Sequence, residues 1–211
     1  MVMVNVEDPV GQGVIASLAH PGGNVTGLTH LQTELVGKRV ELLKEAAPTT
    51  SRLGVVNDGK GGGGRTDIAT AANTLGIQAR SVRVPDAGDI DSAIEKAIRR
   101  GVDSLLVYGY PATLSAPDRI VQAAAQHNLP AIYDRRDFVV AGGLMAYGAN
   151  DAASFRRAAY YVDRILKGTK PADLPVEQPT TFDFVINLKT AQALGLAIPQ
   201  HVLLQATEVV Q

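Results

Sequence analysis

Apolar runs and amphipathic segments alternate along most of the chain. The clearest apolar run is residues 52–58, RLGVVND, in which Leu53, Val55 and Val56 are apolar with little polar alternation. A run of this kind, ended by the turn-forming Asn57 and Asp58, is typical of a strand that is buried on both faces of a sheet. The pattern therefore predicts a central parallel strand at this position.

Similar strands and helices are predicted before and after this one. Strands are expected at 2–6, 25–28, 52–57, 78–84, 104–108, 131–133, 144–147 and 182–186. Helices are expected at 11–18, 34–46, 66–75, 89–99, 116–127, 151–167 and 188–194, with a short helical turn at 136–140. Strands that alternate with helices of about 10–15 residues predict βαβ units, parallel pairing and an α/β fold.

Polar and aromatic residues gather where the predicted strands end. They are Glu7, Asp8, Asn57, Asp58, Tyr108, Tyr110, Tyr133, Asp134, Arg135, Tyr147 and Asn150. In open α/β sheets, ligands bind just beyond the carboxyl ends of the strands. Tyrosine offers a flat apolar face and a hydroxyl, which suits a small amphipathic ligand, and arginine can pair with a carboxylate. The alternative is that the tyrosines cap the sheet and the charged groups are solvated.

Composition excludes several classes of protein. The chain has 211 residues, is 45% hydrophobic and 19% charged, and carries a net charge of −1 without a long basic run. Nucleic-acid binding requires a basic surface, and none is indicated. No apolar stretch is long enough to span a membrane. Cysteine is absent, which excludes thiol catalysis, disulfides and cysteine metal sites.

Two glycine motifs suggest nucleotide chemistry only weakly. Residues 54–60 fit the start of a phosphate-binding loop, but Gly61 stands where Ser or Thr should hold magnesium. Gly11, Gly13 and Ala16 fit G-x-G-x-x-A, but four residues separate the motif from the strand before it. We therefore expect no cofactor.

Catalytic and metal-binding patterns are also missing. The four histidines lack metal-ligand spacing, and no serine stands in a G-x-S-x-G elbow. We expect no metal and no catalytic residue.

Several longer segments resemble a known family. They are DPVGQGVIASLAHPGGNVTGL (8–28), GKRVELLKEAAP (37–48), LPAIYDRRDFVVAGGLMAYG (129–148), RRAAYYVDRILKGTKPADLPVEQPTTFDFVINLKTAQALGLAIP (156–199) and LLQATEVV (203–210). The chain resembles the substrate-binding proteins of ABC transporters, in the branch that includes binding proteins for tryptophan and other aromatic amino acids.

The resemblance implies a type I periplasmic-binding-protein-like fold, with two doubly wound parallel-sheet lobes of which the first is incomplete. Residues 1–48 and 149–175 are expected to form the partial amino-terminal lobe, and residues 49–148 and 176–211 the second lobe. Members normally carry a signal peptide and further βα units before MVMVNV, and we expect this chain to be truncated at its amino end. Dimerisation or domain swapping would cover the lobe face that is left exposed.

The resemblance also implies a function. We expect the solute-binding component of a periplasmic ABC importer, which captures a small organic ligand such as an amino acid and docks on permease subunits. The expected ligand-binding residues are Asp8, Asn57, Asp58, Tyr110, Tyr133, Asp134 and Tyr147. Two alternatives stay open: a nucleotide- or nicotinamide-using enzyme on a Rossmann-like scaffold, and a sensory ligand-binding module.

Overall fold

The chain forms two compact units that are interleaved in sequence. The computed structural model describes residues 1–6, 8–30, 35–59 and 65–211. The first unit comprises residues 1–32 and 149–182, and the second comprises residues 33–148 and 183–211. The chain therefore passes from one unit to the other at three places, after residues 32, 148 and 182.

A mostly parallel sheet forms the centre of the second unit. Among the described residues it has seven strands in the order β4-β3-β5-β6-β7-β8-β9. These are β3 (Arg52–Asn57), β4 (Gln78–Arg83), β5 (Ser104–Val107), β6 (Ala131–Tyr133), β7 (Met145–Ala149), β8 (Phe182–Asn187) and β9 (Glu208–Val210). The strands from β4 to β7 pair in parallel, and β8 pairs in parallel with β9. The predicted central strand is confirmed, because β3 lies between β4 and β5.

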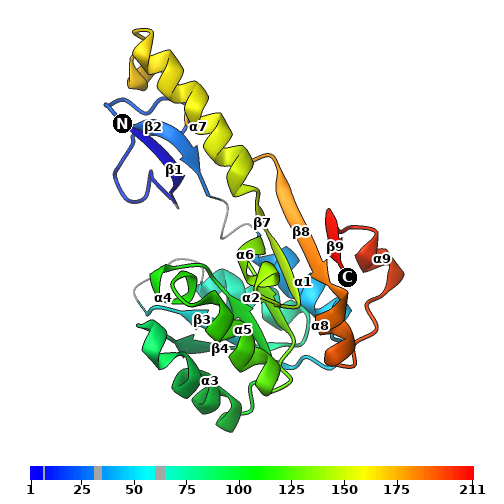
Figure 1. Cartoon of the computed structure of the whole chain (residues 1–211). Helices are drawn as coiled ribbons and strands as arrows, with labels where there is room; N and C mark the ends of the chain where they lie inside the picture. The colour runs from blue at the N-terminus through cyan, green and yellow to red at the C-terminus, as the bar shows by residue number, and fades with distance from the viewer. Residues whose placement is uncertain (7, 31–34, 60–64) are drawn as a thin grey trace. The chain divides into compact units, whose positions relative to one another are not determined.

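Helices cover both faces of this sheet (Figure 1). One layer contains α1 (Val36–Ala46), α2 (Arg65–Thr74), α8 (Leu188–Ala193) and α9 (Gln200–Leu203). The other contains η1 (Ala87–Asp89), α3 (Ile90–Arg99), α4 (Pro111–Leu114), α5 (Pro117–Gln126) and α6 (Arg136–Val140). Successive side chains of a strand point to opposite faces, so Val55 enters the first core and Val56 the second. Both positions are buried, which is why these strands are apolar throughout.

An aspartate ties together the amino ends of β3 and β5. The Asp103 carboxylate accepts hydrogen bonds from the backbone N–H groups of Ser51 and Arg52, and from the Ser51 hydroxyl at 2.6 Å. Burial alone would raise the pKa of Asp103, but the hydrogen bonds from Ser51, Arg52 and Ser104 outweigh it and lower the pKa below its ordinary value of 3.8. Ionised Asp103 therefore stabilises the fold.

We predict that Asp103→Asn lowers the free energy of unfolding by about 1 kcal/mol at pH 7. Because the folded-state pKa is lower than the unfolded one, this contribution is complete above about pH 5 and disappears as the pH falls through the folded-state pKa. Urea unfolding of both proteins between neutral pH and about pH 2.5 measures it. The control is Glu95→Gln, which removes an exposed pair with Arg99. A difference that persists unchanged at acid pH would contradict the assignment.

The first unit is built on a two-stranded parallel sheet. Its strands are β1 (Val2–Val6) and β2 (Thr26–Thr29), and its helices are α7 (Asp151–Leu166) and η2 (Pro171–Asp173). Met3 packs on one face of the sheet with Ile15 and Val25, while Leu28 packs on the other face against α7. Asn150 begins α7, because its side chain accepts a hydrogen bond from the N–H of Ala153 at 2.7 Å.

The structure corrects the helix expected at 11–18. Residues 9–19 form turns and bends instead. The Asp8 carboxylate accepts the N–H of Gly11 at 2.8 Å, and Gly13 has a φ of +70°. Both features favour a turn over a helix, because a side chain that bonds the local backbone competes with helical hydrogen bonds. The glycine motif here is therefore not the start of a helix.

The boundaries of the units also differ from the expected ones. The sequence division placed residues up to 48 in the first lobe, but α1 buries Val40, Leu42 and Leu43 in the core of the second unit. It placed residues 176–182 in the second lobe, but Val176 packs in a core of the first unit. In both cases the apolar face of the segment decides where it belongs.

The expected α/β class with parallel sheets is confirmed. Four short elements, α4, η2, α9 and β9, have no counterpart in the expected pattern. Residues 60–64 lie outside the described residues. They include Gly61, which stands where a phosphate-binding loop would have the Ser or Thr that holds magnesium. In the part of the chain that the structure describes, no helix is both long and apolar enough to cross a membrane.

Candidate functional site

The strand order of the second unit creates a switch point between β3 and β5, at the carboxyl ends of its strands. The helix after β3 is α2, which packs on one face, while α4 and α5 after β5 pack on the other. Neighbouring parallel strands whose connections leave to opposite faces define a topological switch point, where ligands of open α/β sheets bind. The residues just beyond the two strands are Asn57, Asp58, Tyr108, Gly109 and Tyr110.

Tyr110 is held rigidly at this switch point. Its N–H donates to the hydroxyl oxygen of Thr113 at 3.0 Å, and that hydroxyl donates to the carbonyl of Tyr108 at 2.7 Å. Thr113 is fully buried at the start of α4. The backbone on both sides of Gly109 is therefore fixed before any ligand arrives.

The hydroxyl of Tyr110 is buried and has no hydrogen-bond partner among the residues that the structure describes. Burial raises the pKa of the Tyr110 phenol, and the nearby carboxylates of Asp58 and Asp134 raise it further. The hydroxyl therefore stays protonated at neutral pH. A buried hydroxyl without a partner costs about 1–3 kcal/mol, and a bound ligand or water that bonds to it removes this cost.

Asp134 joins the ends of β5 and β6. Only 1% of its surface is exposed, and its carboxylate accepts the N–H of Gly109 at 2.8 Å. A Cβ at position 109 would lie 2.5 Å from Cδ of Arg135, so a larger residue here would have to displace that side chain. Asp134 thus positions the loop that carries Tyr110 and places a negative charge beside it.

The side chain of Asn57 makes its hydrogen bonds to residues of β3, of β4 and of the turn that follows β3. Its amide donates to the carbonyl of Val55 at 2.9 Å and to the hydroxyl of Ser81 at 2.8 Å, and its oxygen accepts the N–H of Gly59. The bond to Ser81 holds the end of β3 against β4, and the other two fix the backbone on either side of Asn57. Its neighbour Asp58 is half-buried beside Tyr110.

A buried arginine that was not among the expected site residues contacts two tyrosines, Tyr108 and Tyr147. Arg39 of α1 is fully buried, and its Nε donates to the carbonyl of Tyr147 at 2.7 Å. Its guanidinium carbon lies 5.4 Å from the centre of the Tyr108 ring. The Tyr147 ring in turn meets Phe184 edge-on at 6.0 Å. Arg39 could have been found from the sequence, because it occupies an apolar position of the helix between Val36 and Val40.

We predict that Arg39→Lys lowers the free energy of unfolding by about 2–3 kcal/mol, because an ammonium cannot reproduce the Nε hydrogen bond and the flat contact with Tyr108. Chemical denaturation measures the change, and Lys38→Arg on the partly exposed side of α1 is the matched control. A loss no larger than that of the control would contradict a role for Arg39 in holding β5 and β7 together.

Two expected site residues do not join this cluster. Tyr133 is 1% exposed and stacks on Phe138 at 4.9 Å in the core, so its ring has no surface left for a ligand. Like Tyr110, it packs on the face of the sheet opposite the Arg39 layer, so its burial and not its face separates it from a ligand. Asp8 belongs to the first unit, where it caps the turn at Gly11. Its contact with a ligand stays a prediction.

The first unit has a hollow of its own. A cavity of about 550 Å³ is lined by Leu28, Asn150, Ser154, Arg157, Glu177 and Thr181, among others. Arg157 is engaged there, because its guanidinium donates two hydrogen bonds to Glu177 at 2.6 and 2.7 Å. Hydrogen bonding from Arg157 lowers the pKa of Glu177, so the pair remains charged at neutral pH.

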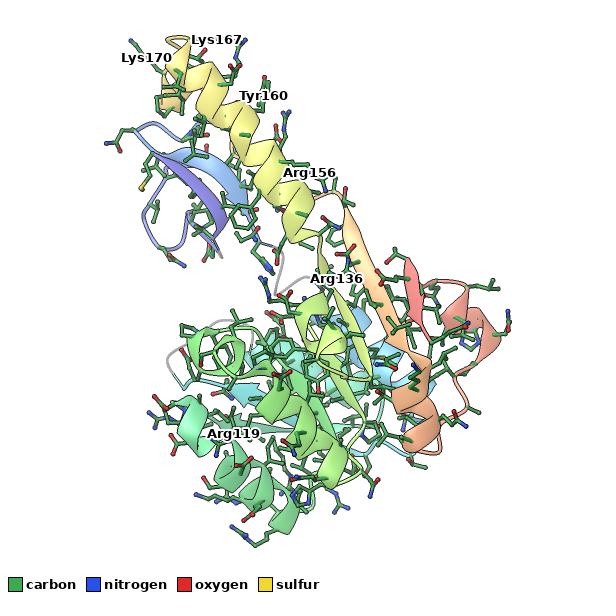
Figure 2. The ribbon with its side chains drawn as sticks, viewed as in Figure 1. Arg119, Arg136, Arg156, Tyr160, Lys167 and Lys170 are labelled. Carbon is green, nitrogen blue, oxygen red and sulfur yellow. The ribbon has the colours of Figure 1, made fainter. Side chains whose placement is uncertain are left out.

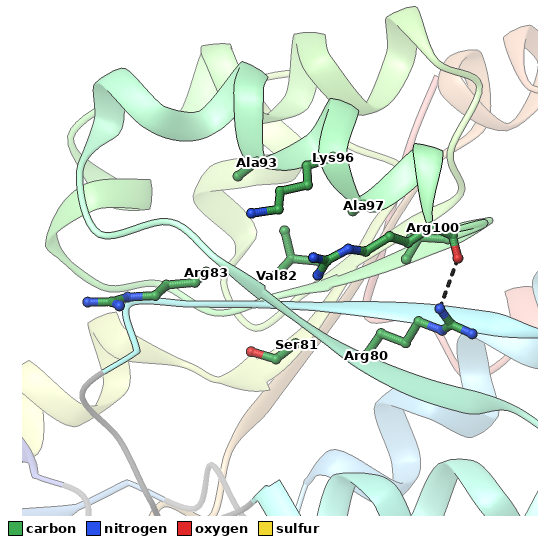
Figure 3. A pocket seen from close by; sticks show the side chains of 9 residues that line it. Arg80, Ser81, Val82, Arg83, Ala93, Lys96, Ala97 and Arg100 are labelled. Carbon is green, nitrogen blue, oxygen red and sulfur yellow. Dashed lines mark hydrogen bonds between the residues drawn. The ribbon is translucent and has the colours of Figure 1, made fainter.

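A basic groove lies along the edge of the second unit, between β4 and α3 (Figure 3). It measures about 440 Å³, and its cationic lining residues are Arg80, Arg83, Lys96 and Arg100. Arg80 donates to the carbonyl of Arg100 at 3.0 Å. The groove runs along the side of β4 rather than beyond the carboxyl ends of β3 and β5. It is therefore separate from the switch point.

Within the described ranges, no three His, Asp or Glu side chains come together to form a metal site. The polar groups at the switch point, Asp58, Tyr110 and Asp134, can hold a ligand by hydrogen bonds and charge.

The comparisons with known proteins identify the family. Over residues 1–210 the chain matches the family described as ABC transporter substrate binding protein, and it belongs to that family. The expectation drawn from the sequence is confirmed. Members are solute-binding proteins and not enzymes, which removes the nucleotide- or nicotinamide-using alternative.

Three relatives show how similar the chain is to other proteins in sequence and, for two of them, in structure. A domain from Streptococcus pneumoniae, crystallised with L-Trp, is 28% identical, with a TM-score of 0.89 over 99% of this chain and 71% of that one. A conserved domain protein from Vibrio cholerae is 31% identical, with a TM-score of 0.88 over 99% and 70% of the two chains. The tyrosine-binding protein of Clostridioides difficile is 23% identical over 199 residues, which are 93% of this chain.

These relatives are longer than the chain. It spans 57% of the length of the curated tyrosine-binding protein that it matches. The architecture agrees with the type I periplasmic-binding-protein fold. Proteins of this family are typically periplasmic or extracellular.

Proposed function

We propose that this chain is the solute-binding component of an ABC importer and that it reversibly captures an aromatic L-amino acid at the switch point of its second unit. The buried hydroxyl of Tyr110, which lacks a partner among the described residues and lies beside Asp58 and Asp134, carries the proposal. The ligands named for two relatives, L-Trp and tyrosine, support the same class of solute.

The charges around the switch point suit a zwitterion. The carboxylates of Asp58 and Asp134 attract the ammonium group of an amino acid. The phenol of Tyr110 stays protonated and donates to the ligand, while the positive charge of Arg39 favours the ligand carboxylate through the field of the site. Sugars carry neither charge, so this site would distinguish amino acids from sugars.

The aromatic preference rests on two half-buried rings. Tyr108 follows β5 and Tyr147 lies in the middle of β7, both on the side of the sheet that Arg39 occupies. Offset or edge-on contact between aromatic rings contributes about 0.5–1.5 kcal/mol beyond the burial of area. We propose that these rings favour tyrosine or tryptophan over aliphatic amino acids.

In this proposal, the first unit is the second lobe that contacts the ligand. Type I binding proteins close two lobes on a ligand, and closure is driven by contacts that exist only when both lobes touch it. Three chain crossings at residues 32, 148 and 182 are consistent with a hinge. We propose that Asp8 contacts the ligand from the first unit and that the loaded protein docks on permease subunits in the periplasm.

The solute class is tested by isothermal titration calorimetry and thermal shift with L-Tyr, L-Trp, L-Phe, L-Leu, a hexose and ATP. We predict saturable binding of at least one aromatic amino acid, at least about tenfold weaker binding of L-Leu, and no binding of the hexose or ATP. Binding of sugars or nucleotides without any aromatic amino acid would contradict the proposal.

Tyr110→Phe tests the site itself. We predict that the free energy of unfolding without ligand is unchanged or rises by up to about 1 kcal/mol, because the variant removes a buried hydroxyl that has no partner. The dissociation constant for the best amino acid should rise about tenfold. Tyr160→Phe, on the exposed face of α7, is the matched control and should change neither quantity. Unchanged affinity in Tyr110→Phe would remove this hydroxyl from the site.

A further inference from the structure

The basic groove between β4 and α3 gathers positive charge that no neighbouring carboxylate balances in the part of the chain that the structure describes. Its cationic side chains, Arg80, Arg83, Lys96 and Arg100, are exposed, and the residues that line it include no Asp or Glu. None of the four takes part in an ion pair between described residues.

The acidic residues of α3 are engaged elsewhere. Asp91 accepts a hydrogen bond from Arg119 at 2.6 Å, and Glu95 pairs with Arg99 at 3.5 Å. Neither carboxylate lines the groove. The positive charge of the groove is therefore available to an anion from outside.

The floor of the groove is apolar. Val82, Ala97 and Val102 are buried and belong to the core beneath α3. Ala93 and Ala97 present only methyl groups on the side of α3 that lines the groove, which leaves a hollow of about 440 Å³. The groove can therefore hold apolar groups on its floor and anionic groups at its rims.

Strand β4 is the edge of its sheet. Among the described residues it pairs with β3 alone. Gln78 and Val84 donate their N–H groups toward that strand, to the carbonyls of Ser51 and Asn57. Because alternate residues of a parallel ladder face the same neighbour, the backbone groups of residues 79, 81 and 83 point away from β3. Such an edge is a template for an added strand.

The cations are spread along the groove and do not meet at one point. Figure 3 shows Arg83 at one end, Arg80 with Arg100 toward the other, and Lys96 between them. A compact anion would contact only part of this row. An extended chain that carries several negative charges matches its whole length.

We propose that the basic groove is a docking site for an extended acidic segment of a partner protein, which adds to the sheet beside β4. The backbone of the segment pairs with residues 79, 81 and 83, and its carboxylates lie beside Arg80, Lys96 and Arg100. Successive side chains of a strand point to opposite faces, so a segment with acidic residues at alternate positions fits best. The main chain then supplies affinity and the charges supply specificity.

The arginines of β4 also select against a second copy of this chain. Pairing two β4 edges would bring the arginines of both copies together, and like charges on neighbouring strands are destabilising. An acidic strand meets no such repulsion. Anionic lipids and polyphosphate could neutralise the cations, but they lack the N–H donors that the open carbonyls of β4 accept.

Fluorescence anisotropy tests the proposal with a labelled peptide of about eight residues in which Glu alternates with Thr or Val. We expect saturable binding at one site, which weakens as the salt concentration rises. Lys96→Glu with Arg100→Glu should raise the dissociation constant at least about tenfold. Circular dichroism and the melting temperature establish that the variant is folded.

The matched control is Arg156→Glu with Lys189→Glu. It changes the net charge by the same amount, and both positions are exposed and lie outside the groove. Figure 2 shows Arg156 on α7, in the first unit. This control should leave the dissociation constant of the peptide within about twofold of the wild-type value. An equal loss in both double variants would overturn the proposal, because net charge alone would then explain the binding.

Backbone methylation tests the added strand. One version of the peptide carries N-methyl groups at every Glu, and another carries them at every Thr or Val. Because the N–H groups of a strand point alternately to its two sides, only one of these versions loses the hydrogen bonds to β4. We expect one version to bind at least about tenfold more weakly than the other. Equal binding of the two versions would overturn strand pairing.

The competing occupants are measured in the same way. Inorganic polyphosphate or phosphatidylglycerol vesicles that bind the groove more tightly than the peptide would overturn the choice of partner, as would a peptide that does not bind. The proposal is independent of the solute site, so the affinity for L-Trp or L-Tyr should be the same in both double variants. Loss of amino-acid binding in the groove variant alone would assign the groove to the solute and overturn the proposal.

Discussion

The position of the site depends on one constraint of the second unit, which is that the connections after β3 and β5 leave on opposite faces of the sheet. Helix α2 packs with α1 on one face, while α4 and α5 pack on the other. Neither helical layer can cover the gap between the two carboxyl ends. This divergence places Asn57 and Asp58 after β3 and Tyr108 and Tyr110 after β5 at the same end of the sheet.

Buried polar contacts then hold the residues at the switch point rigid. Asp134 accepts the N–H of Gly109, and Thr113 bridges the backbone of Tyr108 and Tyr110. The first contact joins the segments that follow β5 and β6, and the second fixes the segment between β5 and α4. The hydroxyl of Tyr110 remains without a partner among the described residues, which is a cost to the free protein that a ligand can remove. Rigid support around one unsatisfied group is what a preorganised binding site requires.

The sequence predicts the sheet better than the site. The run from Leu53 to Val56 identifies a strand buried on both faces, and the polar residues after it lie at the carboxyl end of that strand. The side to which Tyr133 points could not be predicted, because its strand is apolar on both faces and offers no alternation. The helix expected at 11–18 failed for a local reason, since the Asp8 carboxylate caps a turn there. Arg39 was readable as a charge on an apolar helix face, but its contact with Tyr108 depends on tertiary packing.

The central claim is that a solute binds where β3 and β5 end. A crystal structure of the chain grown with L-Tyr or L-Trp tests it most directly. The account predicts that the amino acid lies beyond these two strands, with a polar atom of the ligand within hydrogen-bond distance of the Tyr110 hydroxyl. An amino acid bound instead in the basic groove of Arg80 and Arg100, or an unchanged and unpartnered Tyr110 in the complex, would contradict it.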